Sequence, residues 1–219
     1  MSRRRFMIGK RKDIDLSKDL IDYYKFYYST KDEITGITNS ASISYSANAI
    51  IDMSGYFGSY SSLKFARSSV VYPEFTISVW IKLDGSYYNQ YRGIFSSRST
   101  DEYAQYGLVV EDTLLIVYGN STRMYTEDLP SGKWTMITFV VSNNTGTIYI
   151  NGIKREPFSY PAFPIQPVTY IGCDYLPVNT DQNNRGLRGY MDELAVWSRG
   201  ISSSDVLNLY NNGKGLEIL

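Results

Sequence analysis

Apolar and polar residues alternate along several short stretches of the chain, most clearly over Phe75–Leu83. Successive side chains of a strand point to opposite sides of a sheet, so a period of two predicts a strand with one buried face. The apolar face of this stretch holds five side chains: Phe75, Ile77, Val79, Ile81 and Leu83. Similar runs separated by turn residues follow along the chain, which predicts an all-β protein in which Phe75–Leu83 is half-buried.

The stretch Gly189–Trp197 also alternates and predicts another strand. Strict alternation puts Asp192 on the same face as Leu194 and Val196, so we expect this carboxylate to point inward. A buried carboxylate without partners is costly, so Asp192 requires hydrogen bonds or a cation.

A short helix is predicted directly after this strand, because the apolar spacing changes from two to that of a helix. Ser202 is a suitable N-cap with Asp205 as its capping-box partner, and Ile201 and Val206 can form the hydrophobic staple. Gly213 is expected to supply the left-handed stop.

A strand with Asp-Glu followed by a capped helix resembles the closing signature of laminin-G-like, concanavalin-A-type jelly-roll modules. The residues that carry this resemblance are Gly189, Asp192, Glu193, Val196, Ile201, Ser202, Val206 and Tyr210. Three earlier features recur in the same order in that family: the Trp-containing strand at 132–141, the Ile-Tyr-Ile-Asn-Gly turn at 148–152 and Tyr-Ile-Gly at 170–172. The resemblance covers about residues 19–213. It implies a concanavalin-A-like jelly-roll β-sandwich at 19–219 with a short C-terminal helix, preceded by a basic arm at 1–18.

Charge is distributed unevenly along the chain. Although 22 basic residues balance 22 acidic ones overall, the first twelve residues hold six basic side chains and no acid, which leaves 16 basic against 22 acidic in the rest. The six are Arg3, Arg4, Arg5, Lys10, Arg11 and Lys12. Such an asymmetry predicts docking of the arm to an acidic partner. The arm has little aromatic interleaving, so we expect a protein partner rather than a nucleic acid.

The arm is similar to the basic leaders on virion proteins of tailed bacteriophages. This similarity implies a virion structural or adhesive protein, such as a capsid decoration, head fibre or tail component, anchored by its arm to other virion proteins. Ser2–Met7 also resembles a twin-arginine export motif, but the charged stretch Ile8–Asp13 stands where an apolar segment should follow, so we expect no export signal. We find no apolar run long enough to span a membrane. The sequence leaves open whether the protein forms a homo-oligomer.

The chemistry available to the chain is limited, because it contains no histidine and a single cysteine. Histidine-based catalysis, His-ligated zinc and intrachain disulfides are therefore excluded. Hydrolases of the resembled fold carry Glu-x-Asp-x-x-Glu on one strand, and this spacing does not occur here. The resemblance therefore implies a non-enzymatic protein. A cellular carbohydrate-binding module is the alternative, and a glycoside hydrolase ranks third.

Two long connections, at 84–93 and 174–186, are rich in Tyr and Asn. Loops on a rigid sandwich commonly carry binding sites, and exposed rings beside amides suit surface glycans. The candidate carbohydrate-binding residues are Tyr87, Tyr88, Tyr91, Tyr175, Asn183 and Asn184. The same residues also suit protein contacts, and the frequency of tyrosine agrees with strand propensity alone.

A calcium ion shared by Asp32 and Asp192 is implied by the resemblance, since family members often bind one between the opening Asp loop and the closing strand. Calcium prefers six to eight oxygen ligands. The stretch Leu63–Ser69 offers no acid where many relatives have one or two. Hydrogen bonds alone, from backbone amides or from Arg199, are the alternative partners of Asp192.

Overall fold

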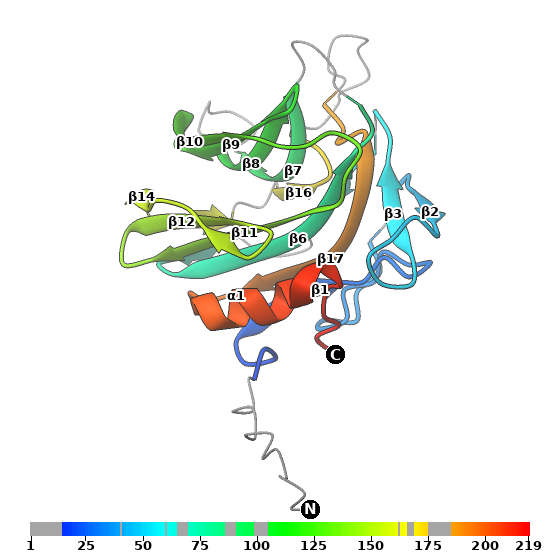
Figure 1. The fold of residues 1–219 in the computed structure, drawn as a ribbon, viewed down its shortest axis with the longest axis horizontal. Helices are drawn as coiled ribbons and strands as arrows, with labels where there is room; N and C mark the ends of the chain where they lie inside the picture. The colour runs from blue at the N-terminus through cyan, green and yellow to red at the C-terminus, as the bar shows by residue number, and fades with distance from the viewer. Residues whose placement is uncertain are drawn as a thin grey trace, which may run out of the picture.

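The computed structural model describes residues 15–39, 41–59, 61–64, 70–85, 91–98, 105–161, 163–165, 169–174 and 185–219. They form two antiparallel β-sheets that face each other, with one helix packed outside the larger sheet (Figure 1). This arrangement confirms the predicted all-β sandwich with a short C-terminal helix.

The larger sheet has the strand order β13-β12-β11-β6-β17-β3-β2, with β1 paired to β17 and β14 to β12. Its strands are β1 (Leu20–Tyr24), β2 (Ser44–Ser46), β3 (Ser54–Phe57), β6 (Phe75–Leu83), β11 (Thr135–Ser142), β12 (Thr145–Ile150), β13 (Ile153–Lys154), β14 (Phe158–Ser159) and β17 (Gly189–Trp197). The central position of β6 and β17 explains why these two strands have the strongest apolar patterns.

The smaller sheet has the order β10-β9-β8-β7-β16-β4, and β15 pairs separately with β5. These strands are β4 (Leu63–Lys64), β5 (Val70–Tyr72), β7 (Tyr91–Arg98), β8 (Gln105–Glu111), β9 (Leu114–Gly119), β10 (Thr122–Asp128), β15 (Phe163–Ile165) and β16 (Thr169–Ile171). β3 and β4 lie in different sheets although only a few residues separate them.

The main core lies between the sheets and contains the predicted apolar face of β6. The opposite face of β6 is also buried, so the prediction of a half-buried strand is wrong. A second apolar cluster covers that face, and in it the rings of Trp80 and Tyr210 stack with centroids 5.7 Å apart. Tyr210 belongs to α1 (Ser203–Tyr210), which lies across the outside of the larger sheet (Figure 1).

The start of α1 is confirmed as predicted, because Ser202 caps it and exchanges capping-box hydrogen bonds with Asp205. Its end differs from the prediction: Asn211 takes the left-handed conformation with φ 46°, before the 3-10 turn η1 (Asn211–Gly213). Asparagine tolerates this conformation better than most residues, so the helix stops two residues earlier than Gly213.

The body of the protein begins before Asp19, within the segment that we assigned to the arm. Leu16 is buried in the outer cluster, and its carbonyl accepts a hydrogen bond from the Trp197 indole at 2.7 Å. Residues 15–18 therefore pack on the body, while the six basic residues of the arm lie outside the described residues. Within the described part, no helix is long and apolar enough to cross a membrane.

A β-bulge interrupts β17 at Asp192 and Glu193. The register with β6 shifts between Asp192 and Ala195, and Glu193 has a left-handed φ of 49°. Met191, Leu194 and Val196 all lie in the core between the sheets, which strict alternation forbids. The bulge adds one residue and so reverses the phase of the side chains. The prediction that Asp192 shares the face of Leu194 is therefore wrong.

Candidate functional site

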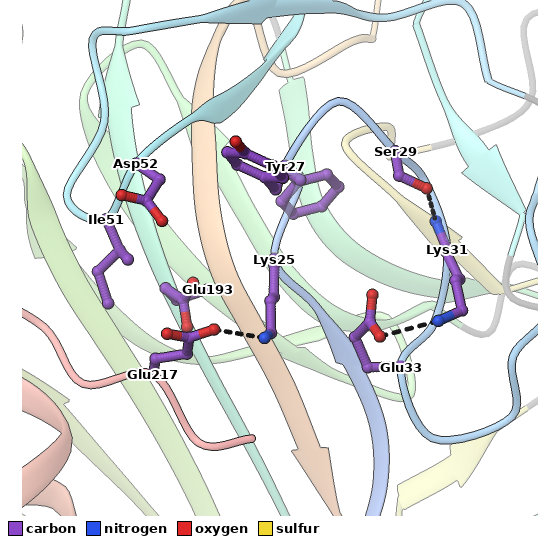
Figure 2. Close-up of a pocket in the computed structure, with 10 residues that line it drawn as sticks. Lys25, Tyr27, Ser29, Lys31, Glu33, Ile51, Asp52, Glu193 and Glu217 are labelled. Atoms are coloured by element: carbon purple, nitrogen blue, oxygen red, sulfur yellow. Dashed lines mark hydrogen bonds and ion pairs between the residues drawn. The ribbon is translucent and has the colours of Figure 1, made fainter.

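A cavity of about 310 Å³ lies beside this bulge (Figure 2). Four segments distant in sequence form it: the loop after β1, the turn before β3, the bulge of β17 and the C-terminal segment. The lining residues are Lys25, Phe26, Tyr27, Ser29, Lys31, Glu33, Ile51, Asp52, Glu193 and Glu217. Its size is at the lower end of the range for small-molecule sites.

Glu193 is the most buried acidic residue of the lining, with only 6% of its surface exposed. Burial raises the pKa of its carboxyl to about 8, and the nearby acids Asp192 and Glu217 raise this pKa further. The hydrogen bond from Tyr23 and the charge of Lys25 act in the opposite direction, without cancelling the effect of burial. An acid of this kind in a cavity is a candidate functional group.

Tyr23 fixes the position of Glu193. Its buried hydroxyl donates a hydrogen bond to the Oε2 atom of Glu193 and accepts one from the Ile218 amide at 3.2 Å. Burial raises the pKa of the Tyr23 phenol, so the hydroxyl keeps its proton and acts as a donor. The carboxyl is thereby tied to both β1 and the C-terminal segment.

Both lysines of the cavity are already paired. Lys25 donates to Glu217 and, at 2.7 Å, to the backbone oxygen of Leu219. Lys31 forms an ion pair with Glu33 at 3.0 Å.

Asp52 is the remaining acid of the lining, in a turn where its φ is 47°. Figure 2 shows its carboxylate across the cavity from Lys25, and it has no hydrogen bond or ion pair with any described residue. The cavity therefore contains a carboxylate that is free to bind a ligand.

One exposed tyrosine ring lines the cavity, and a second lies beside it. Tyr27 lines it with 56% of its surface exposed, and Tyr28 beside it is 65% exposed. The two rings meet edge to face with centroids 5.3 Å apart, and Tyr28 also contacts Tyr45. Large exposed aromatic surfaces of this kind are typical of recognition sites.

Asp192, predicted as a metal ligand, supports the turn that carries Asp52. Its Oδ2 atom accepts hydrogen bonds from the amides of Ile50 at 2.9 Å and Ile51 at 3.0 Å. Its Oδ1 atom is buried without a partner among the described residues. Burial raises the pKa of Asp192 to about 7, and the charge of Asp52 adds to this rise.

Asp32, the other predicted metal ligand, is surrounded by donors. One carboxylate oxygen accepts from the amides of Tyr23 at 2.9 Å and Ile34 at 3.1 Å. The other accepts from the amide of Thr35 at 3.2 Å and from its hydroxyl. Hydrogen atoms therefore point at the positions that a cation would occupy.

These contacts do not fit a calcium ion. Calcium requires a set of oxygen ligands, and no three acidic or cysteine side chains come together suitably among the residues that the structure describes. The shared ion stays a prediction without support from this geometry.

The only predicted carbohydrate-binding residue within the described part is Tyr91. It belongs to an apolar cluster on the outer face of the smaller sheet. Arg123 donates to its hydroxyl at 2.9 Å, and the Arg185 guanidinium lies 5.7 Å from its ring centroid. Both cations are paired, Arg123 with Glu111 and Arg185 with Asp174. The other five residues, Tyr87, Tyr88, Tyr175, Asn183 and Asn184, lie outside the described residues.

Sequence reasoning missed the cavity, although two signals for it were present. The adjacent acids Asp192 and Glu193 indicated a site on this strand. Asp192 was predicted as the functional acid, whereas Glu193 is the one that lines the cavity. The doublet Tyr27-Tyr28 was a second signal, since paired tyrosines in a polar loop are available for binding.

Comparison with known families supports the fold. The profile of the "Concanavalin A-like lectin/glucanases superfamily" matches residues 57–207. No curated protein matches the chain significantly.

Three of the similar solved structures illustrate the range of proteins with this fold. Domain 4 of AbnA, an extracellular GH43 arabinanase of Geobacillus stearothermophilus in complex with arabinotriose, is 18% identical over 87% of this chain and 97% of that chain, with a TM-score of 0.69. A structure of botulinum neurotoxin type C, whose cell entry depends on two ganglioside molecules, is 15% identical over 89% of this chain and 51% of that one, with a TM-score of 0.66. A Trypanosoma rangeli sialidase mutant with trans-sialidase activity is 10% identical over 93% of this chain and 35% of that one, with a TM-score of 0.65. The chain thus spans about half of the toxin chain and a third of the sialidase chain.

Proposed function

The chain belongs to the concanavalin A-like lectin/glucanases superfamily, and we propose that it binds glycans, without cleaving them, in the cavity beside Tyr27. The observation that carries this proposal is one cavity that combines an exposed tyrosine ring with carboxylates. Sugars present an apolar face of C–H groups, which suits the tyrosine ring, and a rim of hydroxyls, which suits the carboxylates.

The Tyr27 ring supplies the apolar contact. An aromatic ring has a negative face, which attracts the weakly positive C–H groups of a sugar packed on it. The Asp52 carboxylate supplies strong acceptors for sugar hydroxyls, because hydrogen bonds to a charged oxygen are stronger than neutral ones. Ser29 adds a small hydroxyl to the lining.

Two structural neighbours agree with glycan binding. The arabinanase domain was solved with arabinotriose, and entry of the neurotoxin depends on gangliosides. These are properties of those proteins, and they motivate the choice of glycans as ligands for this one.

Glycan-array screening followed by calorimetry tests the proposal. Tyr27→Ala should weaken binding of the best glycan by about tenfold, which corresponds to the ~1.4 kcal/mol expected of one aromatic contact. Tyr28→Ala is the matched control, since Tyr28 is more exposed than Tyr27 and does not line the cavity. The absence of any bound glycan, or equal losses in both variants, would contradict the proposal.

A glycoside hydrolase is the second candidate, favoured by one observation. Glycosidases use a carboxylic acid with a raised pKa beside an ionised carboxylate, and the cavity contains Glu193, with a pKa of about 8, and Asp52. A reducing-sugar assay on the glycans that bind decides between the candidates. Release of sugar that Glu193→Gln abolishes would establish the enzyme.

We also propose that the basic arm attaches the protein to a virion, where the body faces outward. The support is the charge asymmetry between residues 1–12 and the rest of the chain. Deletion of residues 2–12 should leave a folded β-protein that no longer joins the particle. Full incorporation of the truncated protein would contradict this role.

A further inference from the structure

Building on the proposed glycan site, we infer that the cavity selects glycans that carry a free, positively charged amino group. Glu193 and Asp52 are the residues that recognise this group. The ligand class is thus the amino sugars with an unacetylated amine.

The first argument is the balance of charge in the cavity. Four acids and two lysines line it, and each lysine is paired with an acid of the lining. The two acids that remain without a basic partner among the described residues are Asp52 and Glu193. A cationic ligand is attracted by the Asp52 carboxylate and favours ionisation of Glu193, which otherwise holds its proton near neutral pH, whereas an anionic ligand is repelled.

The second argument is the state of the Glu193 carboxyl. Its Oε2 atom accepts the Tyr23 hydroxyl, but Oε1 has no hydrogen-bond partner among the residues described, although 94% of the residue is buried. Figure 2 shows the side chain lining the cavity beside Lys25 and Glu217. Oε1 is not among the fully buried atoms of the described residues that lack a partner, so it opens toward the cavity, where a donor of the ligand can reach it.

An ammonium group satisfies these acids better than the alternatives. Its three donors are enough for one hydrogen bond to each of the two acids and one to water or to Ser29. A sugar hydroxyl fills a hydrogen bond but brings no charge. A metal ion lacks a ligand set here, since no suitable group of three acids occurs in the described part of the chain.

The protonation of Glu193 agrees with this inference. Burial and the acids Asp192 and Glu217 hold its proton near neutral pH, against the effects of Tyr23 and Lys25. A bound ammonium would favour the ionised carboxylate and replace that proton as the partner of Oε1.

The test compares matched sugars by calorimetry near neutral pH. The probes are oligosaccharides of glucosamine and of galactosamine, each with its N-acetylated counterpart, which differs only in the charge and size of the amino group. We expect the free amines to bind at least about tenfold more tightly, and this preference to decrease with added salt. Asp52→Asn and Glu193→Gln should each reduce the preference to about threefold or less. Glu156→Gln, at an exposed acid that does not line the cavity, should leave it unchanged.

The outcomes separate this inference from the proposed function. Equal or tighter binding of the N-acetylated sugars overturns the charge selectivity but leaves glycan binding standing. If none of the four probes binds, the selectivity is also wrong, and binding of other glycans on the array then decides the proposed function. Asp52 is exposed, so Asp52→Asn should fold normally and keeps the test decisive even if Glu193→Gln is unstable.

Discussion

Two regions of the molecule surround a tyrosine ring with charged groups, and they differ in how those charges are balanced. Around Tyr91, each arginine has a carboxylate partner and the tyrosine hydroxyl accepts from Arg123. Beside Tyr27, two carboxyl groups remain without a basic partner among the described residues, and one of them is buried. Both regions look like recognition sites by residue type alone.

This difference indicates where a ligand gains the most free energy on binding. Binding at Tyr91 must replace existing ion pairs and hydrogen bonds, so the net gain is small. Binding at the cavity adds partners to the Asp52 carboxylate and to Oε1 of Glu193, neither of which has one among the described residues. We therefore interpret the Tyr91 cluster as a stabilising contact of the smaller sheet, and the cavity as the ligand site.

Among the substitutions, the largest effect is expected from Tyr23→Phe, which removes the hydroxyl that holds the Glu193 carboxyl in place. The substitution leaves Glu193 without its buried donor and Ile218 without its acceptor. An unsatisfied buried polar group costs about 1–3 kcal/mol, which is roughly 2–12 °C in the melting temperature for a domain of this size. Differential scanning calorimetry measures this shift. Tyr28→Phe, at an exposed ring, should change it by less than about 1 °C.

The contrast between the two tyrosines gives the next prediction. Tyr91→Ala should lower stability by about 1–2 kcal/mol, because contacts with two guanidinium groups and an apolar cluster are lost, while glycan affinity stays within about twofold of wild type. Tyr27→Ala should show the opposite pattern. Loss of glycan binding in Tyr91→Ala, with retention in Tyr27→Ala, would move the binding site to the smaller sheet.

Some elements of the fold around the two regions could be predicted from the sequence. The strand Phe75–Leu83 and the cap at Ser202 follow from local patterns, because alternation and capping act over a few residues. The edge strand Thr122–Asp128 was missed, since an exposed edge needs no apolar alternation. Burial of the outer face of β6 depends on a helix more than a hundred residues away, which no local pattern of the strand indicates.

The bulge that directs Glu193 into the cavity could not be predicted, for a physical reason that centres on this residue. A left-handed glutamate is unfavourable by itself and persists only when tertiary contacts compensate for its cost, so the bulge has no local signature. The bulge then decides which acid faces the cavity. The other lining residues come from segments at 25–33, 51–52 and 217, which meet only in the folded protein.

The pH dependence of stability reports on the same acids. The folded protein keeps the Glu193 proton up to about pH 8 and the Asp192 proton up to about pH 7, whereas the unfolded chain releases both near pH 4. Between these values the folded state binds more protons, so stability falls as pH rises, by up to about 1.4 kcal/mol per pH unit for each group.

Melting curves recorded between about pH 5 and about pH 8 measure this slope. Where both acids titrate, wild type should lose up to roughly 5–11 °C per pH unit, and Glu193→Gln should lose about half as much, because only Asp192 still titrates. The lowered pKa of Glu127, which comes first from its hydrogen bonds to Arg155, acts at more acidic pH and does not interfere. Stability that rises with pH across this window would contradict the buried, protonated state of both acids.

The smallest effect is expected from removal of divalent metal ions. If Asp32 and Asp192 held a calcium ion, chelation would remove the term RT ln(1 + [L]/Kd), about 2.7 kcal/mol at a hundredfold excess over Kd, and lower the melting temperature by roughly 5–10 °C. The Asp32 oxygens instead accept four hydrogen bonds, and the Oδ2 atom of Asp192 accepts two amides. We therefore expect EDTA to shift the melting temperature by less than about 1 °C.

Asp32→Ala should still destabilise the protein, by about 1–3 kcal/mol, because the amides that donate to Asp32 lose their acceptor. This loss should be the same with EDTA and with added calcium. A calcium-dependent melting temperature that Asp32→Ala abolishes would instead establish the metal site, and the hydrogen-bonded arrangement of Asp32 would then describe only the metal-free protein.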